Sequence, residues 1–172
     1  MILYPKMLLN SVAEITPEIL EKNNIKAIIL DVDNTLINIK QELSENVKNW
    51  VKQMKENNIK LYILSNTNDK EKVGKVSTAL DIPYINLAKK PFKKGFLKVQ
   101  NILQEKPENI AAVGDQIFTD VIGGNRCKMF TILVEPIQKK EYWYTRWKRP
   151  IENIIKNKYK NKPTKSKNKG EK

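Results

Sequence analysis

Two carboxylates, Asp31 and Asp33, stand two positions apart directly after an apolar segment. Residues 26–30 are predicted to form a buried strand, so Asp31 falls where that strand ends. Because side chains alternate along an extended chain, both carboxylates can face the same side, where one could attack a phosphorus atom while the other moves a proton. The alternative is a turn that closes the strand, with Asn34 and Thr35 as turn-forming residues. This segment alone does not decide between the two.

Three later polar clusters also follow predicted strands. The hydroxyl of Ser65 and the adjacent backbone N–H groups could hold phosphate oxygens. A lysine of Lys89-Lys90-Pro91 could offer a positive charge to a phosphoryl group, and Asp115 and Asp120 could hold a hard cation. Mg²⁺ keeps several of its waters, so two or three carboxylates are sufficient. Each cluster alone is typical of an ordinary turn, but four clusters at the ends of successive strands indicate one shared phosphoryl-transfer site.

Strands that alternate with helices must position these residues. The predicted strands lie at residues 26–30, 59–64, 84–87, 110–113 and 130–134, and the predicted helices at 44–56, 69–80, 94–103 and from about 115 to 123. This alternation predicts an α/β domain with a doubly wound parallel sheet, in which the carboxyl ends of the strands line one crevice. The first 24 residues are expected to form a helix that begins at Thr16-Pro17-Glu18 and packs on the sheet.

The composition excludes several classes of site. The chain has no histidine, which excludes Ser-His and Cys-His nucleophile pairs and His-ligated metal centres. Its single cysteine, Cys127, permits no internal disulfide and no cysteine zinc site, as expected for a reducing compartment. No apolar run approaches the roughly 20 residues that span a bilayer, and the first residues lack a signal-peptide pattern. We therefore expect a cytoplasmic protein, with a peripheral position on the inner face of the membrane as the open alternative.

The positive charge is concentrated toward the end of the chain, which has the length of one ordinary domain. The net charge is +13, and residues 137–172 hold 13 of the 32 Lys and Arg residues but three of the 19 acidic residues. Such a segment favours an anionic partner, although a Lys- and Asn-rich bias would also produce a solvated tail. The expected parts are an N-terminal helical segment, a core, a basic aromatic segment and a disordered Lys-rich tail, at residues 1–24, 25–136, 137–159 and 160–172.

Aromatic rings alternate with cations at residues 139–149, which include Trp143, Tyr144 and Trp147. The first interpretation is that these rings pack against the domain while the charges face water. The second is a membrane interface, where rings lie at headgroup depth and lysines meet anionic lipid. Stacking on single-stranded nucleic acid is the least favoured interpretation. The oligomeric state is left open by the sequence.

The four clusters together resemble the haloacid dehalogenase (HAD) superfamily of aspartate-nucleophile phosphatases, through Asp31-x-Asp33-x-Thr35, Ser65, Lys90-Pro91 and Gly114-Asp115-x4-Asp120. Longer matches resemble the YqeG family, a subfamily IIIA group related to the mitochondrial phosphatidylglycerophosphate phosphatases. They lie at residues 31–36, 65–66, 88–91, 114–116, 119–121, 123–126 and 131–134. The resemblance extends from about residue 15 to about residue 154 and implies a single HAD-like, Rossmann-like sheet.

The resemblance implies a Mg²⁺-dependent phosphatase. Asp31 would be the nucleophile that forms an aspartyl-phosphate, and Asp33 would protonate the leaving alcohol and then activate water. Asp31, Asp115 and the backbone carbonyl of Asp33 would bind the metal. Asp120 would complete the metal site, directly or through water, and Thr35 would support the motif, as in phosphatases of this superfamily rather than its dehalogenases.

The same resemblance implies that Ser65, Asn66 and Lys90 bind the phosphoryl group. Superfamily members often carry a cap domain, but here Asp31 and Ser65 are 34 positions apart and Ser65 and Lys90 are 25 positions apart. Each gap is filled by about one helix and one strand, so no cap is expected. An open site suits a bulky substrate or one presented at a surface, and it also suits a small substrate if neighbouring subunits close over it.

Three hypotheses for the function follow. The favoured one is a phosphatase of phosphatidylglycerophosphate, because an open site beside a basic aromatic segment suits a phosphomonoester on an anionic lipid headgroup. The second is a phosphatase of a small soluble phosphomonoester. The third is a protein that binds RNA or another polyanion through its basic tail.

Overall fold

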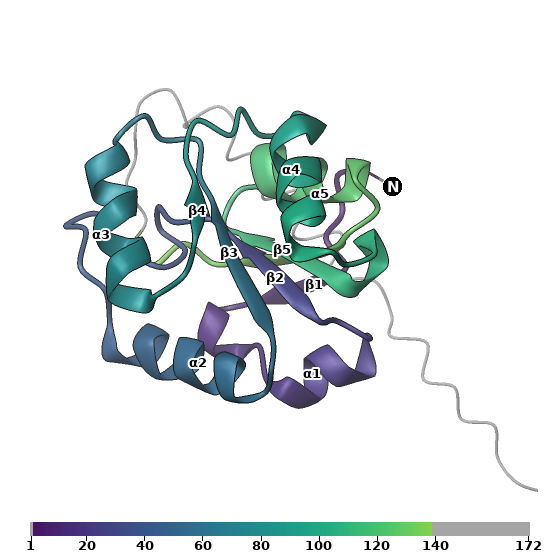
Figure 1. Cartoon of the computed structure of the whole chain (residues 1–172), viewed down its shortest axis with the longest axis horizontal. Coiled ribbons are helices and arrows are strands. Elements are labelled where there is room, and N and C mark those ends of the chain that lie inside the picture. Colours follow the sequence, from purple (N-terminus) through teal and green to yellow (C-terminus); the bar gives the residue numbers. More distant parts are fainter. Residues whose placement is uncertain (1, 139–172) are drawn as a thin grey trace, which may run out of the picture. The chain divides into compact units, whose positions relative to one another are not determined.

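A parallel sheet of six strands organises residues 2–138, the part of the chain described in this computed structural model (Figure 1). The strands are β1 (Met7–Leu9), β2 (Ala27–Leu30), β3 (Lys60–Leu64), β4 (Tyr84–Ile85), β5 (Ile110–Gly114) and β6 (Phe130–Val134). They lie in the order β1-β6-β5-β2-β3-β4, and every neighbouring pair is parallel. The strand order reverses between β2 and β5, and ligands of open α/β sheets bind outside the carboxyl ends of the strands at such a point. The predicted fold class is confirmed.

Helices cover both faces of the sheet. The α-helices are α1 (Pro17–Lys22), α2 (Glu45–Glu56), α3 (Lys70–Leu80), α4 (Lys93–Leu103) and α5 (Ile122–Arg126), and the shorter turns are η1 (Val12–Glu14), η2 (Pro107–Asn109) and the π-helical η3 (Ile117–Val121). Because side chains alternate along a strand, Ile28 packs with apolar residues of α1, α2 and α3. Ile29 packs on the other face, with Phe96 and Val99 of α4. Figure 1 shows α1, α2 and α3 on one side of the sheet and α4 and α5 on the other.

The start of the chain differs from the predicted helix over the first 24 residues. A helix does begin at Pro17, and the side chain of its N-cap residue, Thr16, accepts a hydrogen bond from the backbone N–H of Ile19 at 3.4 Å. Before it, however, β1 forms an edge strand that pairs with β6, with Leu8 opposite Leu133. A strand of three residues is too short to show an alternation of its own, and its partner lies near the other end of the described chain.

Two of the predicted parts extend beyond the described residues. Apart from residues 137 and 138, the basic aromatic segment predicted at 137–159 and the tail predicted at 160–172 lie outside them. Within residues 2–138, no helix is both long enough and apolar enough to cross a bilayer.

Candidate active site

Three predicted site residues follow neighbouring strands at the carboxyl edge of the sheet. Asp31 follows β2, Ser65 follows β3 and Asp115 follows β5. β2 lies between the other two strands, with Leu30 opposite Val113 of β5. The backbone N–H of Asp31 donates to the carbonyl of Val113 at 2.9 Å and so extends this pairing beyond the strand end. The register therefore brings the ends of three strands together at the reversal point of the sheet.

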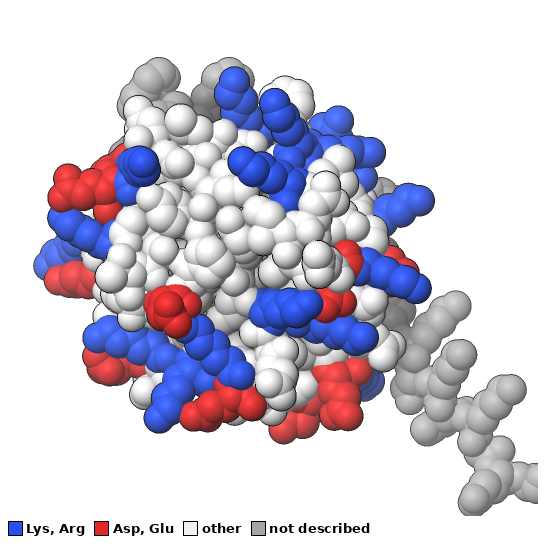
Figure 2. All heavy atoms as spheres, viewed as in Figure 1, with Lys and Arg blue, Asp and Glu red and all other residues white. Residues whose placement is uncertain are grey.

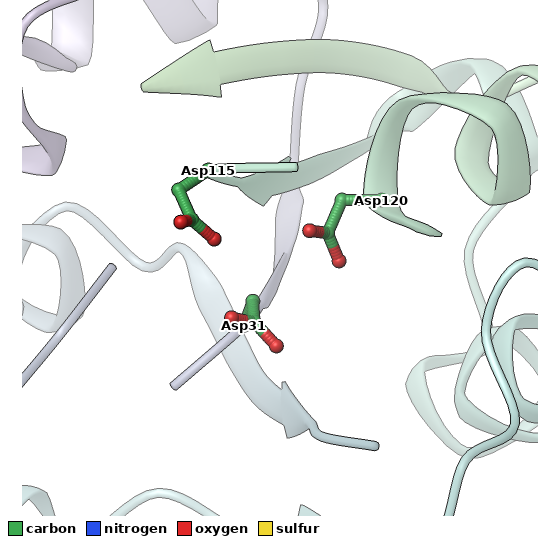
Figure 3. Close-up of side chains that lie close together, drawn as sticks. All are labelled: Asp31, Asp115 and Asp120. Carbon is green, nitrogen blue, oxygen red and sulfur yellow. The ribbon is translucent and has the colours of Figure 1, made fainter. Parts of the chain in front are cut away.

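Three carboxylates converge at this point (Figure 3). Asp31, Asp115 and Asp120 each offer an oxygen that lies within 4.8 Å of the other two. Asp31 and Asp120 are buried and Asp115 is half-buried. Asp120 comes from η3, where its Oδ2 accepts hydrogen bonds from Gln116 N at 3.4 Å and from Thr119 Oγ1 at 3.1 Å. We call Asp31, Asp115 and Asp120 the acidic cluster.

The absence of a side chain at Gly114 leaves room for Asp120 beside the end of β5. A Cβ at position 114 would lie 2.3 Å from Cγ of Asp120, far closer than real contacts. We therefore expect Gly114→Ala to lower the free energy of unfolding by about 1–3 kcal/mol through overpacking. The matched control is Gly74→Ala in α3, whose new Cβ would lie 3.7 Å from Tyr84 Oη, an ordinary contact. Urea unfolding compares the two, and equal stability of both variants would contradict the expectation.

Lys90 is buried between two members of the acidic cluster. Its Nζ lies 2.5 Å from Oδ1 of Asp31 and 2.6 Å from Oδ1 of Asp120, and its side chain is 2% exposed. The peptide bond between Lys90 and Pro91 is cis. Asn66 holds this loop, because its Oδ1 accepts from the backbone N–H of Lys90 at 2.6 Å and its Nδ2 donates to the carbonyl of Lys90 at 3.1 Å. The side chain of Asn66, expected to bind phosphate, thus contacts the main chain that carries Lys90.

The acidic cluster and Lys90 shift each other's pKa values. Burial raises the pKa of Asp31 to about 7; the Lys90 ammonium opposes this shift and the Asp120 charge adds to it. Burial, followed by the charges of Asp31 and Asp120, raises the pKa of Asp115 well above its usual range. Burial disfavours the charged form of Lys90, but the carboxylates of Asp120 and Asp31 outweigh it and raise the pKa of this ammonium. The site therefore holds more carboxylate than the ammonium of Lys90 can neutralise.

The residues present fit a divalent metal ion. Carboxylate oxygens are the ligands that hard cations prefer, and three of them converge here. Oδ1 of Asp115 is buried and has no hydrogen-bond partner among the described residues. A buried polar atom of this kind normally pairs with a water or an ion. A divalent cation would also balance the excess negative charge of the acidic cluster.

The carboxylate of Asp33 lies outside the acidic cluster. Its Oδ1 accepts a hydrogen bond from Nζ of Lys72 at 2.7 Å, and the Lys72 side chain is 14% exposed. Lys72 belongs to the first turn of α3, and sequence analysis missed it because one lysine in a Lys-rich chain carries no signal. The position of Lys72 on the helix could have identified this residue. Lys72 lies one turn before the buried Val76, on the same face of a helix that begins at the carboxyl edge of the sheet.

The two hydroxyl residues of the predicted site are both buried. Ser65 Oγ accepts a hydrogen bond from the backbone N–H of Thr67 at 3.2 Å, at the end of β3. Thr35 Oγ1 has no hydrogen-bond partner among the described residues. Thr35 lines a cavity of about 370 Å³ together with residues of η1 and α2, and no member of the acidic cluster lines that cavity.

Comparison with known proteins finds a family model and a relative that are both described as phosphatases. A family model described as mitochondrial PGP phosphatase matches residues 1–138. The chain is 38% identical over 152 residues to "Probable phosphatase YqeG" of Bacillus subtilis (strain 168), a match that covers 88% of each sequence.

Two solved structures share the fold. An uncharacterized protein from Listeria monocytogenes serotype 4b has a TM-score of 0.55 and 20% identity, over 77% of this chain and 99% of that chain. A hypothetical protein from Xanthomonas campestris has a TM-score of 0.52 and 10% identity, over 80% of this chain and 78% of that chain. The family model and the B. subtilis relative confirm the resemblance found in the motifs: the chain belongs to the mitochondrial PGP phosphatase family and is a HAD phosphatase of the YqeG type.

Proposed function

We propose that this phosphatase hydrolyses phosphatidylglycerophosphate to phosphatidylglycerol, with Mg²⁺ as cofactor and an aspartyl-phosphate on Asp31. The observation that carries the proposal is the convergence of the acidic cluster and Lys90 at the reversal point of the sheet. The substrate is supported by the description of the family, which names PGP. It is also supported by the connections at residues 31–44 and 65–69, which are too short to hold a cap domain over the site, as suits a substrate presented at a surface.

The chain's own residues would carry the reaction in two steps. A carboxylate oxygen of Asp31 attacks phosphorus, the bond between phosphorus and the glycerol oxygen breaks, and Asp33 protonates that oxygen. Water then attacks the phosphorus of the aspartyl-phosphate, and Asp33 takes its proton. The bond between phosphorus and the Asp31 oxygen breaks, which restores the Asp31 carboxylate and releases inorganic phosphate. Ser65 and Lys90 bind the phosphoryl oxygens in both steps. Asp31, Asp115 and the backbone carbonyl of Asp33 would hold Mg²⁺, with Asp120 in support, and the ion would neutralise charge on the phosphoryl group.

Mg²⁺ is expected to raise the unfolding temperature, and to do so more strongly at about pH 8 than at about pH 5. Because burial raises the pKa of Asp31 from 3.8 to about 7, the folded metal-free protein holds a proton that the unfolded chain has already released. Between pH 3.8 and about pH 7, the free energy of unfolding of the metal-free protein therefore falls as the pH rises. At about pH 8, Mg²⁺ meets less competition from protons for the Asp31 carboxylate than at about pH 5. Calorimetry with Mg²⁺ or with EDTA measures the effect, and Asp115→Asn should reduce it. Identical unfolding temperatures with and without Mg²⁺ at both pH values would contradict the metal assignment.

Lys72 is expected to position Asp33 for proton transfer. Lys72→Met should lower kcat for p-nitrophenyl phosphate by roughly tenfold, with little change in KM, because a general acid or base contributes about a hundredfold or more when it is held in place. Lys75→Met is the control, since Lys75 pairs with Glu71 at 2.7 Å on the exposed side of the same helix. Equal kcat values for the two variants would show that Lys72 does not position Asp33 for proton transfer.

The substrate is tested by phosphate release from phosphatidylglycerophosphate in mixed micelles with Mg²⁺. The wild-type protein should release phosphate and Asp31→Asn should not. If the wild-type protein leaves the lipid intact but cleaves p-nitrophenyl phosphate, the phosphatase chemistry stands and the substrate is a soluble phosphomonoester instead.

A further inference from the structure

We propose that the loop before α4 and the first turn of α4 form a docking surface for an anionic lipid bilayer. This surface consists of the exposed side chains of Leu87, Lys89, Phe92, Lys93 and Lys94, and we call it the Leu87–Lys94 surface. The inference rests on the proposed lipid substrate and adds to it the part of the protein that meets the membrane.

The Leu87–Lys94 surface borders the site directly. Leu87 and Phe92 are 57% and 63% exposed, and between them lies Lys90, whose Nζ contacts Asp31 and Asp120 inside the site. One short loop thus turns a buried lysine toward the phosphoryl site and two large apolar side chains toward solvent. The backbone of Leu87 is held at a φ of 52°, in the left-handed region that bulky residues rarely adopt. Two large apolar side chains exposed on one short loop beside the site suit an interaction surface.

The charge of this surface has one sign. No Asp or Glu occurs between Asp81 and Glu105, whereas five lysines do, at positions 89, 90, 93, 94 and 98. Among the ion pairs of residues 2–138, none involves Lys89, Lys93 or Lys94. Figure 2 shows blue side chains without red ones over the region of α4, whereas both colours mix over α2. Because an anionic bilayer attracts clustered lysines near its surface, this charge fits such a partner.

The start of α4 increases the positive potential. The N-terminal end of a helix is already positive, and acidic residues or side-chain caps usually balance it. α2 begins with the capping side chain of Ser44 and has Glu45 in its first turn. The N-cap residue of α4 is instead Phe92, whose side chain makes no capping hydrogen bond. The first turn of α4 carries Lys93 and Lys94 and no acidic residue. These residues do not favour the helix, which indicates that they are placed for a partner outside it.

The apolar residues favour a bilayer over a nucleic acid. Single-stranded nucleic acids bind basic surfaces through rings on which bases stack. Leu87 has no ring, so on this surface only Phe92 could stack. The interfacial layer of a bilayer accepts aliphatic and aromatic side chains alike, while the lysines remain at headgroup level. If the domain docks through this loop, the carboxyl edge of its sheet lies close to the lipid headgroups.

The first experiment measures binding of the full-length protein to vesicles. Wild-type protein should sediment with vesicles of about 70% phosphatidylcholine and 30% phosphatidylglycerol, and more weakly with pure phosphatidylcholine. Leu87→Ser with Phe92→Ser should weaken this partition by about tenfold or more. Hydrolysis of p-nitrophenyl phosphate should be unchanged, since neither side chain is in the catalytic machinery. The matched control is Leu97→Ser with Ile102→Ser, which removes two exposed apolar residues from α4 beyond its first turn and should leave partition within about twofold.

A second experiment locates the contact, because residues 139–172 are also basic. A fluorophore that reports polarity is attached at Phe92→Cys, or at Lys52→Cys on the exposed surface of α2, while native Cys127 is buried. Anionic vesicles should shift the emission to the blue for the probe at position 92 and leave the probe at position 52 unchanged. Vesicle binding by wild-type protein without a response at position 92 would overturn the proposal. So would the absence of vesicle binding, or a double variant that loses binding to oligouridine but not to vesicles.

These outcomes are separable from those for the substrate. If partition depends on the Leu87–Lys94 surface but phosphatidylglycerophosphate is not cleaved, the docking surface stands and the lipid substrate is wrong. If the lipid is cleaved and partition is the same in the double variant, the substrate stands and the docking surface is wrong.

Discussion

Replacing Asp31 by Asn is expected to lower hydrolysis of p-nitrophenyl phosphate by a factor of about 10³ or more. The amide has nearly the shape of the carboxylate, but it is not a nucleophile toward phosphorus, so the aspartyl-phosphate cannot form. The fold should persist, because Asp31 contributes a charge that burial disfavours and Asp120 repels. In EDTA at about pH 8 the variant should be at least as stable as the wild-type protein, since the raised pKa of Asp31 makes its ionised form a destabilising feature there.

Two measurements separate this effect from misfolding. Steady-state turnover is compared with urea unfolding for the same preparation. The control is Asp69→Asn, because Asp69 caps α3 through its side chain and Asn is an equally good capping residue. That control should keep both activity and stability, whereas turnover near the wild-type value in Asp31→Asn would rule out Asp31 as the nucleophile.

The second large effect is expected from Lys90→Met, which should reduce stability and activity together. Lys90 neutralises two buried carboxylates, Asp31 and Asp120, and its removal leaves both without their ammonium partner. Breaking a buried charge pair by removing one partner costs about 3–5 kcal/mol. The loss of free energy of unfolding should be largest in EDTA at about pH 8 and smaller at about pH 5, where a proton can neutralise Asp31, whose pKa burial raises to about 7. Turnover should fall by about 10² or more, because Lys90 is also expected to stabilise charge on the phosphoryl group.

Lys89→Met provides the comparison for this prediction. Lys89 is the neighbouring residue in the same loop, but its side chain is exposed and forms no ion pair among residues 2–138. Its replacement should leave the free energy of unfolding and the turnover of p-nitrophenyl phosphate within error of the wild-type values. If Lys90→Met were as stable as Lys89→Met in EDTA at about pH 8, the charge balance described for the site would be wrong.

The sequence by itself determined five of the six strands of the sheet and most positions of the candidate site. Long apolar runs that end in Asp31, Ser65 and Asp115 are local signals, because a buried strand needs continuous apolar residues and its polar end must lie at an edge. The alternation of these strands with helices determines a parallel sheet, and a parallel sheet brings the carboxyl ends of its strands together. The family could also be recognised, because its motifs are short runs of contiguous residues.

Only the tertiary structure decided which side chains meet. Lys72 reaches Asp33 across 39 positions and Asn66 holds Lys90 across 24, and neither pairing follows from propensity or periodicity. The pairing of β1 with β6 and the space that Gly114 leaves for Asp120 were equally invisible, because each depends on how distant segments pack. The physical reason is the same in every case. Local sequence sets the free energy of a helix or strand, whereas the contacts between them are set by register, helical phase and the volume available in the folded chain.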